Sequence, residues 1–295
     1  MKLQTEKATV VFNILGFTVM TVLTLACLLP FWVILSGSFT SEMEIIAEGF
    51  KLWPSQFSIE AYQSVFSNPG QILRAYEVTI ILTLVGTAVG LFLTSMAGYV
   101  LSRKEFKYRN GLAFFIYFTT LFSGGLIPWY ILIVKYMDLK DSYLSLLLPF
   151  IISAWNIILM KNFIKSIPDS IAESAKIDGA GDFRIFWSLI LPLSAPGLAT
   201  IGLFMALAYW NDWFLANLFI TTEDKFPLQY LLYKILASAA VLKTDIAGNL
   251  SPDMKPPAET LKMAASVVVT GPIVFLYPFV QRFFVKGLTI GAVKG

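Results

Sequence analysis

The sequence predicts an all-α integral membrane protein, and three observations lead to that prediction. Of the 295 residues, 57% are hydrophobic and 14% are charged, and the mean hydropathy is +0.71, far from the average soluble protein. Apolar stretches of bilayer-spanning length recur along the whole chain, and the charged residues concentrate between them. We therefore expect a single transmembrane domain that covers residues 1–295.

Six apolar stretches are expected to cross the bilayer as helices, at about residues 8–35, 78–101, 111–134, 142–163, 197–220 and 262–285. The first is too long for the apolar core of a signal peptide and lacks a small-residue cleavage site, so we expect it to remain uncleaved. The second carries Gly86 and Gly90 at a spacing that lets helix backbones approach closely, either within the subunit or between subunits. In the third, Gly124, Gly125 and Pro128 predict a break, which must be buried in protein or line a water-filled path.

The distribution of charges predicts how the chain is oriented. Basic residues gather on one side when the N-terminus is placed inside, so the positive-inside rule puts both termini in the cytoplasm. Segment 36–74, expected to form a small helical cap, then lies outside. Most of the acidic residues also lie outside, including Glu42, Glu44, Glu48, Glu60 and Glu77. The basic residues placed inside are Lys2, Lys7, Arg103, Lys104, Lys107, Arg109, Lys161, Lys165, Lys176, Arg184, Arg282, Lys286 and Lys294.

A polar segment, residues 167–196, separates the fourth and fifth expected spans. It carries six charged side chains, and each would cost a few kcal/mol at the bilayer centre, so the segment lies in water. Pro168 favours a helix start, and Gly179 and Gly181 end that helix at a corner. A second short helix is expected from Asp182 to Leu191, because Asp182 suits a helix cap and prolines follow.

This segment resembles the signature loop of ATP-binding-cassette importer permeases, which reads E-A-A, three residues, G, nine residues and I-x-L-P. Here Ser174 and Leu189 depart from the pattern, and both changes are small in volume. A solvated connector is the alternative, but a connector has no reason to combine these residues at these spacings. The resemblance implies a coupling helix that docks on a cytoplasmic ATPase, with Glu173 as its anchor. The implied coupling residues are Glu173, Ser174, Ala175, Asp178, Gly179, Ala180 and Gly181.

Further runs look like the carbohydrate-importer branch of these permeases, and are similar to the smaller maltose-importer permease and to oligosaccharide or polysaccharide-fragment importers. They are residues 123–128 (SGGLIP), 209–213 (YWNDW), 227–234 (PLQYLLYK) and 286–295 (KGLTIGAVKG). The resemblance implies the type I importer permease fold in a bacterial plasma (inner) membrane. It implies as partners a second, homologous permease, two copies of a cytoplasmic ATPase and an extracytoplasmic solute-binding protein. The tail 286–295 would reach between the ATPase subunits, unless it is a plain frayed terminus.

Composition argues against an enzyme. The chain has no histidine, a single cysteine, Cys27, and no G-x-x-x-x-G-K-[ST] loop, so the usual general base, a thiolate metal site and P-loop ATP binding are excluded. We expect no cofactor in this chain, with ATP and Mg bound by the partner ATPase. A net charge of +3 without a basic, aromatic-interleaved patch makes nucleic acid an unsuitable partner.

The fifth expected span carries aromatic, amide and carboxylate side chains in its outer half. On a continuous helix, Tyr209, Asp212, Trp213 and Ala216 would share one face. Rings to stack on and hydrogen-bonding groups suit a sugar ring, while an interfacial aromatic belt is the equally weighted alternative. Two residues of the fourth span are weaker candidates, for which helix packing is favoured. The substrate-path candidates are Tyr209, Trp210, Asn211, Asp212, Trp213, Asn217, Trp155 and Asn156.

These features predict one permease half of an ATP-driven oligosaccharide importer that works by alternating access. A secondary transporter or channel with Asp212 as a proton or cation site is the alternative, and a non-transporting membrane scaffold is a third possibility. The sequence leaves neutral and uronic-acid oligosaccharides open as substrates.

Overall fold

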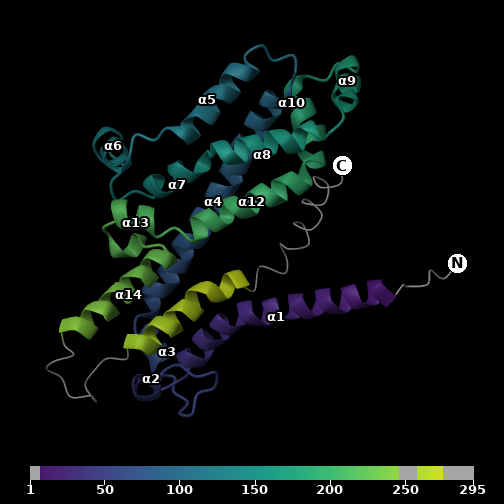
Figure 1. Ribbon diagram of the computed structural model, residues 1–295. Coiled ribbons are helices and arrows are strands. Elements are labelled where there is room, and N and C mark those ends of the chain that lie inside the picture. The colour runs from purple at the N-terminus through teal and green to yellow at the C-terminus, as the bar shows by residue number, and fades with distance from the viewer. Residues whose placement is uncertain (1–6, 246–257, 275–295) are drawn as a thin grey trace. The chain divides into compact units, whose positions relative to one another are not determined.

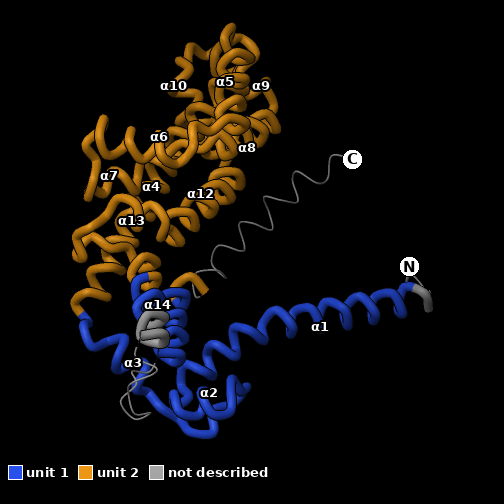
Figure 2. The backbone as a smooth tube through the Cα atoms, turned by 60° about the vertical axis from the view of Figure 1, so that its left-hand side comes forward, with its two compact units in different colours: residues 1–69, 234–271 blue, residues 70–233, 272–295 orange. Residues whose placement is uncertain are grey.

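The computed structural model describes residues 7–245 and 258–274, which form helices and connecting loops (Figure 1). Backbone contacts divide the chain into two compact units, residues 1–69 with 234–271 and residues 70–233 with 272–295 (Figure 2). In the described part, two helices are long and apolar enough to cross a membrane, and three bent helix pairs pass the same test as single spans. The two long helices and the first two bent pairs coincide with the first four expected spans, whereas the third bent pair, Asp182–Leu193 with Ala195–Trp210, begins before the expected fifth span. The sixth, 262–285, continues beyond the described residues.

The first unit contains α1 (Lys7–Ser38), α2 (Glu42–Glu48), α3 (Glu60–Val65) and a helix over residues 258–271 that continues to residue 274. No charged side chain occurs in α1 after Lys7, and Pro30 lies inside this helix without ending it. Segment 36–74 contains the two short helices α2 and α3, joined by loops, as expected for a partly helical cap.

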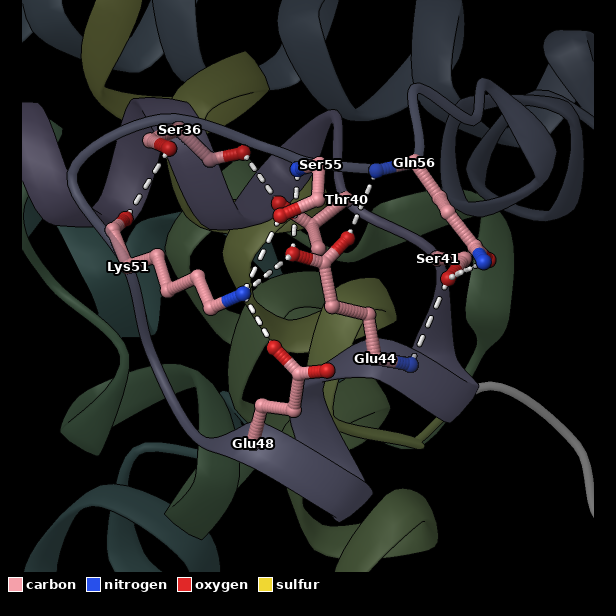
Figure 3. Close-up of polar contacts among 8 residues, drawn as sticks. All are labelled: Ser36, Thr40, Ser41, Glu44, Glu48, Lys51, Ser55 and Gln56. Atoms are coloured by element: carbon pink, nitrogen blue, oxygen red, sulfur yellow. Dashed lines mark hydrogen bonds and ion pairs between the residues drawn. The ribbon is translucent and has the colours of Figure 1, made fainter.

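The Glu44 carboxylate organises the loop that follows α2 (Figure 3). It accepts the backbone N–H groups of Gln56 and Ser55 at 2.8 and 3.0 Å, and the Lys51 ammonium lies 3.4 Å away. These hydrogen bonds, the one from Gln56 first, lower the pKa of Glu44 to about 2. Lys51 also pairs with Glu48, so the loop is fastened to both ends of a seven-residue helix.

A second carboxylate of the same helix caps the helix that begins at residue 258. Glu42 accepts the backbone N–H groups of Glu259 and Thr260 at 2.9 and 2.8 Å, and the Thr260 hydroxyl at 2.8 Å. The first N–H groups of a helix have no partner within it, so an acidic side chain at this place satisfies them and complements the helix dipole.

The second unit is built around α4 (Pro69–Ser102), whose glycines are contact points for other helices. A Cβ at Gly86 would lie 2.3 Å from Cζ of Tyr209, and one at Gly90 would lie 2.8 Å from Cε of Met205. The G-x-x-x-G spacing thus packs α12 (Ala195–Trp210) against α4 within the subunit. The remaining elements are α5 (Arg109–Leu121), α6 (Leu126–Ile131), η1 (Leu132–Tyr136), α7 (Tyr143–Ile151), α8 (Ala154–Lys165), α9 (Asp169–Ile177), α10 (Asp182–Ile185), η2 (Phe186–Ile190), α11 (Leu191–Leu193), α13 (Phe214–Phe219), η3 (Glu223–Lys225) and the start of α14 (Leu228–Asp245).

The third expected span is broken where its sequence predicts. Helix α5 ends at Leu121, α6 begins at Leu126, and the axis turns by 112° between α5 and the segment Leu126–Tyr136. Gly125 adopts a φ of +87°, which only glycine reaches without strain. The fourth expected span is also bent, by 43° between α7 and α8, although we expected a continuous helix.

Candidate functional site

The coupling loop predicted from the sequence is a helix packed onto the spans, and α9 forms its first half. Ala172, on the inner face of α9, is 1% exposed and belongs to a core cluster with Tyr99 of α4, Met160 of α8 and Ile185 of α10. Gly98 lies against Met160 so closely that a Cβ there would be 2.8 Å from Cγ, which brings α4 and α8 together beneath the loop. The loop therefore shares one packed core with three helices of the second unit.

The corner after α9 depends on Gly179, whose φ is +82°. The N–H of Ala180 donates to the carbonyl of Ala175 at 2.9 Å, and the N–H of Gly179 donates to that of Lys176 at 3.0 Å. These two bonds define a Schellman motif, which satisfies the last carbonyls of a helix and requires a left-handed residue at this position. Ala175 and Ala180 are partly buried against the core cluster, as the motif favours.

The outer face of the loop is exposed. Glu173 and Ser174 are exposed on α9, and Glu173 makes no ion pair with any described residue. Ile177 is 87% exposed, and the stacked rings of Phe183 and Trp187 are 62% and 53% exposed. A short helix that presents a carboxylate with no ion-pair partner among the described residues, beside exposed apolar side chains, has the composition of a protein-docking surface.

An ion pair ties the start of α9 to the loop that follows α4. The Lys104 ammonium lies 2.9 Å from the Asp169 carboxylate, which raises the pKa of Lys104 and lowers that of Asp169. Both side chains are more than half exposed, so this pair contributes little to stability. The pair is informative about topology. It shows that the 103–109 loop and the coupling loop lie at the same end of the second unit, as the charge distribution predicts.

The expectation of one continuous helix over residues 197–220 is wrong. Helix α12 ends at Trp210, and α13 begins at Phe214 after a turn. The Asp212 carboxylate accepts the N–H of Leu215 at 3.1 Å and thereby caps α13. The predicted helical face of Tyr209, Asp212, Trp213 and Ala216 therefore does not exist, because a capping carboxylate starts a new helix inside the run.

The substrate-path candidates separate by exposure. Tyr209 is 3% exposed, donates its hydroxyl to the carbonyl of Leu147 at 2.8 Å and fills space between helices. Trp210 and Asn156 are also buried. Trp155 is 67% exposed and lies at the separate break between α7 and α8. The candidates left exposed or half-buried at the 211–213 turn and on α13 are Asn211, Asp212, Trp213 and Asn217.

Two residues of α14 join these candidates. Tyr233 stacks on Trp213 with ring centroids 4.7 Å apart, and Gln229 donates its amide N–H to Oδ1 of Asn211 at 3.3 Å. We did not single out either α14 residue from the sequence. Their four-residue spacing, which places both on one helical face within the 227–234 run, is the signal that could have found them.

An open groove of about 770 Å³ lies at the break in the third span. Residues 123–125 and Trp129 line it on one side and Phe214 of α13 on the other. The break is thus exposed within this chain and is not buried among its own helices. Among the described residues, no group of acidic or cysteine side chains could hold a metal ion.

Comparison with known proteins decides the family. Residues 86–290 match the family described as the inner membrane component of binding-protein-dependent transport systems. The chain belongs to this family of permeases. It is thus the membrane component of an ATP-binding-cassette (ABC) transporter and not an enzyme, since the ATPase is a separate subunit. The permease has the type I importer permease fold, and its family implies a partner permease, an ATPase and a solute-binding protein.

Relatives of this permease match it over nearly its full length. The polygalacturonan/rhamnogalacturonan transport system permease protein YtcP of Bacillus subtilis is 43% identical over 286 residues, 96% of this chain and 98% of the relative. Protein LplC of the same organism is 43% identical and covers 91% of this chain and 90% of its own. In a crystal structure of a bacterial ABC transporter involved in the import of the acidic polysaccharide alginate, one chain aligns with a TM-score of 0.81 and 31% identity, covering 96% of this chain and 99% of that chain.

Proposed function

We propose that this permease is one half of the translocation path of an ATP-driven importer for oligosaccharide fragments of acidic polysaccharides. The observation that carries the proposal is the loop at residues 167–196, whose first helix packs onto three spans and presents Glu173, which forms no ion pair with a described residue, to solvent. A second, homologous permease, two ATPase copies that bind ATP and Mg, and an extracytoplasmic solute-binding protein complete the machine.

The coupling loop would convert ATP binding into motion of the spans. Closure of the ATPase dimer draws the coupling loops of the two permeases together. Because the inner face of α9 shares a core with α4, α8 and α12, a push on α9 moves these helices as one body. The path then opens outward and accepts sugar from the binding protein, and hydrolysis resets it.

The exposed group at residues 211–213 would contact the sugar. Trp213 stacked on Tyr233 offers an aromatic face, and Asn211 with Gln229 offers amide donors and acceptors. The similarity to transporters named for polygalacturonan/rhamnogalacturonan and for alginate favours uronic-acid oligosaccharides over neutral ones. The family draws its energy from an ATPase, and Asp212 acts as a helix cap, so no observation favours an ion-coupled transporter or a scaffold.

The test is a charge reversal at the coupling loop. In proteoliposomes that hold the complete importer, Glu173→Lys should reduce substrate-stimulated ATP hydrolysis and uptake of galacturonate or mannuronate oligosaccharides by about tenfold or more, because it removes a charged docking contact. Glu60→Lys, at an exposed glutamate in the first turn of α3, is the matched control and should change neither.

Each outcome bears on a different part of the proposal. Normal uptake by the Glu173→Lys complex would remove Glu173 from the coupling role. A wild-type complex that hydrolyses ATP in response to neutral maltodextrins and not to uronic-acid oligosaccharides would overturn the substrate class while leaving the importer function in place.

A further inference from the structure

Asp141, in the loop between η1 and α7, gathers hydrogen-bond donors from the segment that follows α13. Its carboxylate accepts the N–H groups of Thr221 and Thr222 at 2.9 and 3.0 Å, the Thr222 hydroxyl at 2.7 Å and the Lys225 ammonium at 2.9 Å. Its carbonyl accepts a second bond from Lys225 at 2.5 Å, and its own N–H donates to the carbonyl of Phe219 at 2.8 Å. These donors, the Thr222 hydroxyl foremost, hold the pKa of Asp141 well below its usual range. No comparable convergence joins two such distant segments elsewhere among the described residues of the second unit.

The helix held in this way is too short to be stable on its own. Helix α13 has six residues, and isolated helices need roughly 12–15 residues before they persist in water. The Asp212 carboxylate caps its N-terminus through the N–H of Leu215, and the backbone N–H of Asp141 donates to the carbonyl of Phe219 at its C-terminus. The Asp212 side chain therefore holds the first end of α13, and the Asp141 carboxylate holds residues 221 and 222, which follow its last end directly.

The position of α13 determines what lines the groove. One face of the helix is buried, with Ala216 and Phe219 both 0% exposed, and the Phe219 ring stacks on Tyr130 with centroids 5.7 Å apart. The helix lies beside α7 (Figure 1) and presents Phe214, 42% exposed, to the groove formed at the break in the third span. A small rotation of α13 would move Phe214 relative to residues 123–125.

We propose that Asp141 is a positioning residue that clamps the end of α13 to the loop between the third and fourth expected spans and so sets the width of the groove through which the oligosaccharide passes. This inference rests on the proposed function and adds to it a residue that does not touch the sugar. The clamp keeps the broken third span and the broken fifth span in fixed register, so that neither break widens when the coupling loop moves the inner helices.

The backbone conformation of Asp141 allows loss of the carboxylate to be separated from backbone strain. Its φ is +56°, so Asp141→Ala would add backbone strain to the loss of the carboxylate, whereas Asp141→Gly removes the carboxylate alone. Asp138 has a φ of +52° in the same loop, is exposed and makes no side-chain hydrogen bond or ion pair with a described residue. Asp138→Gly is therefore the matched control.

The decisive measurement is the amount of sugar transported per ATP hydrolysed by the full complex in proteoliposomes. Asp141→Gly should lower this ratio by about tenfold, as expected when charge-assisted hydrogen bonds are lost, while substrate-stimulated ATP hydrolysis changes less than about twofold. Asp141→Asn keeps one acceptor oxygen and tolerates the backbone, so its ratio should fall in between. Asp138→Gly should match the wild type. An unchanged ratio in Asp141→Gly, or an equal loss in Asp138→Gly, overturns the clamp.

A reversible cross-link separates positioning from folding. In a Cys27→Ala background, the pair Asp141→Cys and Thr222→Cys replaces the hydrogen bond between these side chains by a disulfide that can be reduced. Sugar transport should be low under reducing conditions and rise when the disulfide forms. The backbone strain of a cysteine at position 141 is the same in both states, so the comparison isolates the link. Efficient cross-linking without recovery of transport would refute the clamp. If the wild-type complex moves no oligosaccharide at all, the proposed function fails. The clamp can then still be judged, because formation of the disulfide tests the contact itself.

Discussion

Single residues at corners and caps carry much of the described structure. Glu44 holds a loop by two backbone N–H groups, Asp212 starts a helix, and Gly179 turns the chain after the coupling helix. The two carboxylates accept backbone N–H groups that have no partner in regular secondary structure, and Gly179 adopts a backbone conformation that other residues reach only with strain. Substitutions at these positions therefore test local geometry more directly than substitutions in the core.

The coupling corner predicts a position-specific effect of adding a methyl group. A Cβ added at either Gly179 or Gly181 would meet no atom within 4 Å, so packing is not the difference between them. Gly179 has a φ of +82°, and forcing an L-residue into this region costs about 1–2 kcal/mol. Gly179→Ala should therefore weaken substrate-stimulated ATP hydrolysis of the complex several-fold.

Gly181 serves as the control, because its φ is −72°. Gly181→Ala should leave the hydrolysis rate unchanged, and Gly179→Asn should retain more activity than Gly179→Ala, since Asn tolerates the left-handed region. Equal effects of both alanine variants would show that the left-handed corner is not what the loop requires.

The Glu44 loop predicts a pH dependence with a defined sign. The pKa of Glu44 is about 2 in the folded protein against an ordinary value of 4.5. The folded loop therefore stabilises the ionised carboxylate relative to the protonated one. Its stabilising contribution is therefore complete above about pH 4.5 and is lost as the pH falls from there toward 2. After correction for intrinsic rates, amide exchange at Ser55 and Gln56 should accelerate over this range.

Hydrogen exchange of the Ser55 and Gln56 amides also tests the role of Glu44 by substitution. Glu44→Gln should expose the Ser55 and Gln56 amides to exchange at neutral pH. Glu48→Gln, which removes only the exposed partner of Lys51, should leave them protected. Unchanged protection of these two amides in Glu44→Gln would mean that other contacts hold the loop.

At the scale of elements, the glycines of α4 are contact surfaces for neighbouring helices. Gly86→Ala should lower the thermal unfolding temperature of the permease, because the added methyl would overlap the buried Tyr209 ring and overpacking costs about 1–3 kcal/mol. Gly16→Ala in α1, where nothing lies within 4 Å, should not lower it. A Gly86→Ala protein as stable as the wild type would show that α12 can move away from α4 without cost.

Helix breaks were partly predictable. The break in the third span follows from Gly124, Gly125 and Pro128, whose backbone preferences act locally. No glycine or proline near Trp210 predicts the break that follows it. This break depends instead on the hydrogen bond from the Leu215 N–H to the Asp212 carboxylate. An aspartate in an apolar run can be read equally as a polar lining residue, so its capping role became visible only in the folded chain.

At the scale of the whole molecule, the orientation of the permease can be tested with cysteines. In a Cys27→Ala background, Lys140→Cys should react with a membrane-impermeant maleimide added to intact cells, because the 135–141 loop is predicted to lie outside. Lys107→Cys, equally exposed in the 103–109 loop, should react only after the membrane is permeabilised. The reverse labelling pattern would invert the predicted topology, including the cytoplasmic placement of the coupling loop.

Two contacts support the paired placement of loops. Lys104 meets Asp169, and Asp141 meets Thr222, and each pair joins loops predicted to lie on the same side of the membrane. The predicted role of the 286–295 tail lies outside the described residues. The count of six spans stays a prediction, because the last one continues past residue 274.

The sequence by itself determined the membrane class, the two helices and glycine corner of segment 167–196, and the break in the third span. These depend on composition and on short-range backbone preferences, which are local properties of the chain. Only the tertiary structure decided that the α4 glycines pack within the subunit, that Tyr209 and Trp210 are buried, and that α13 is a separate helix held at both ends. Those outcomes depend on which side chains, far apart in the sequence, meet once the helices have packed.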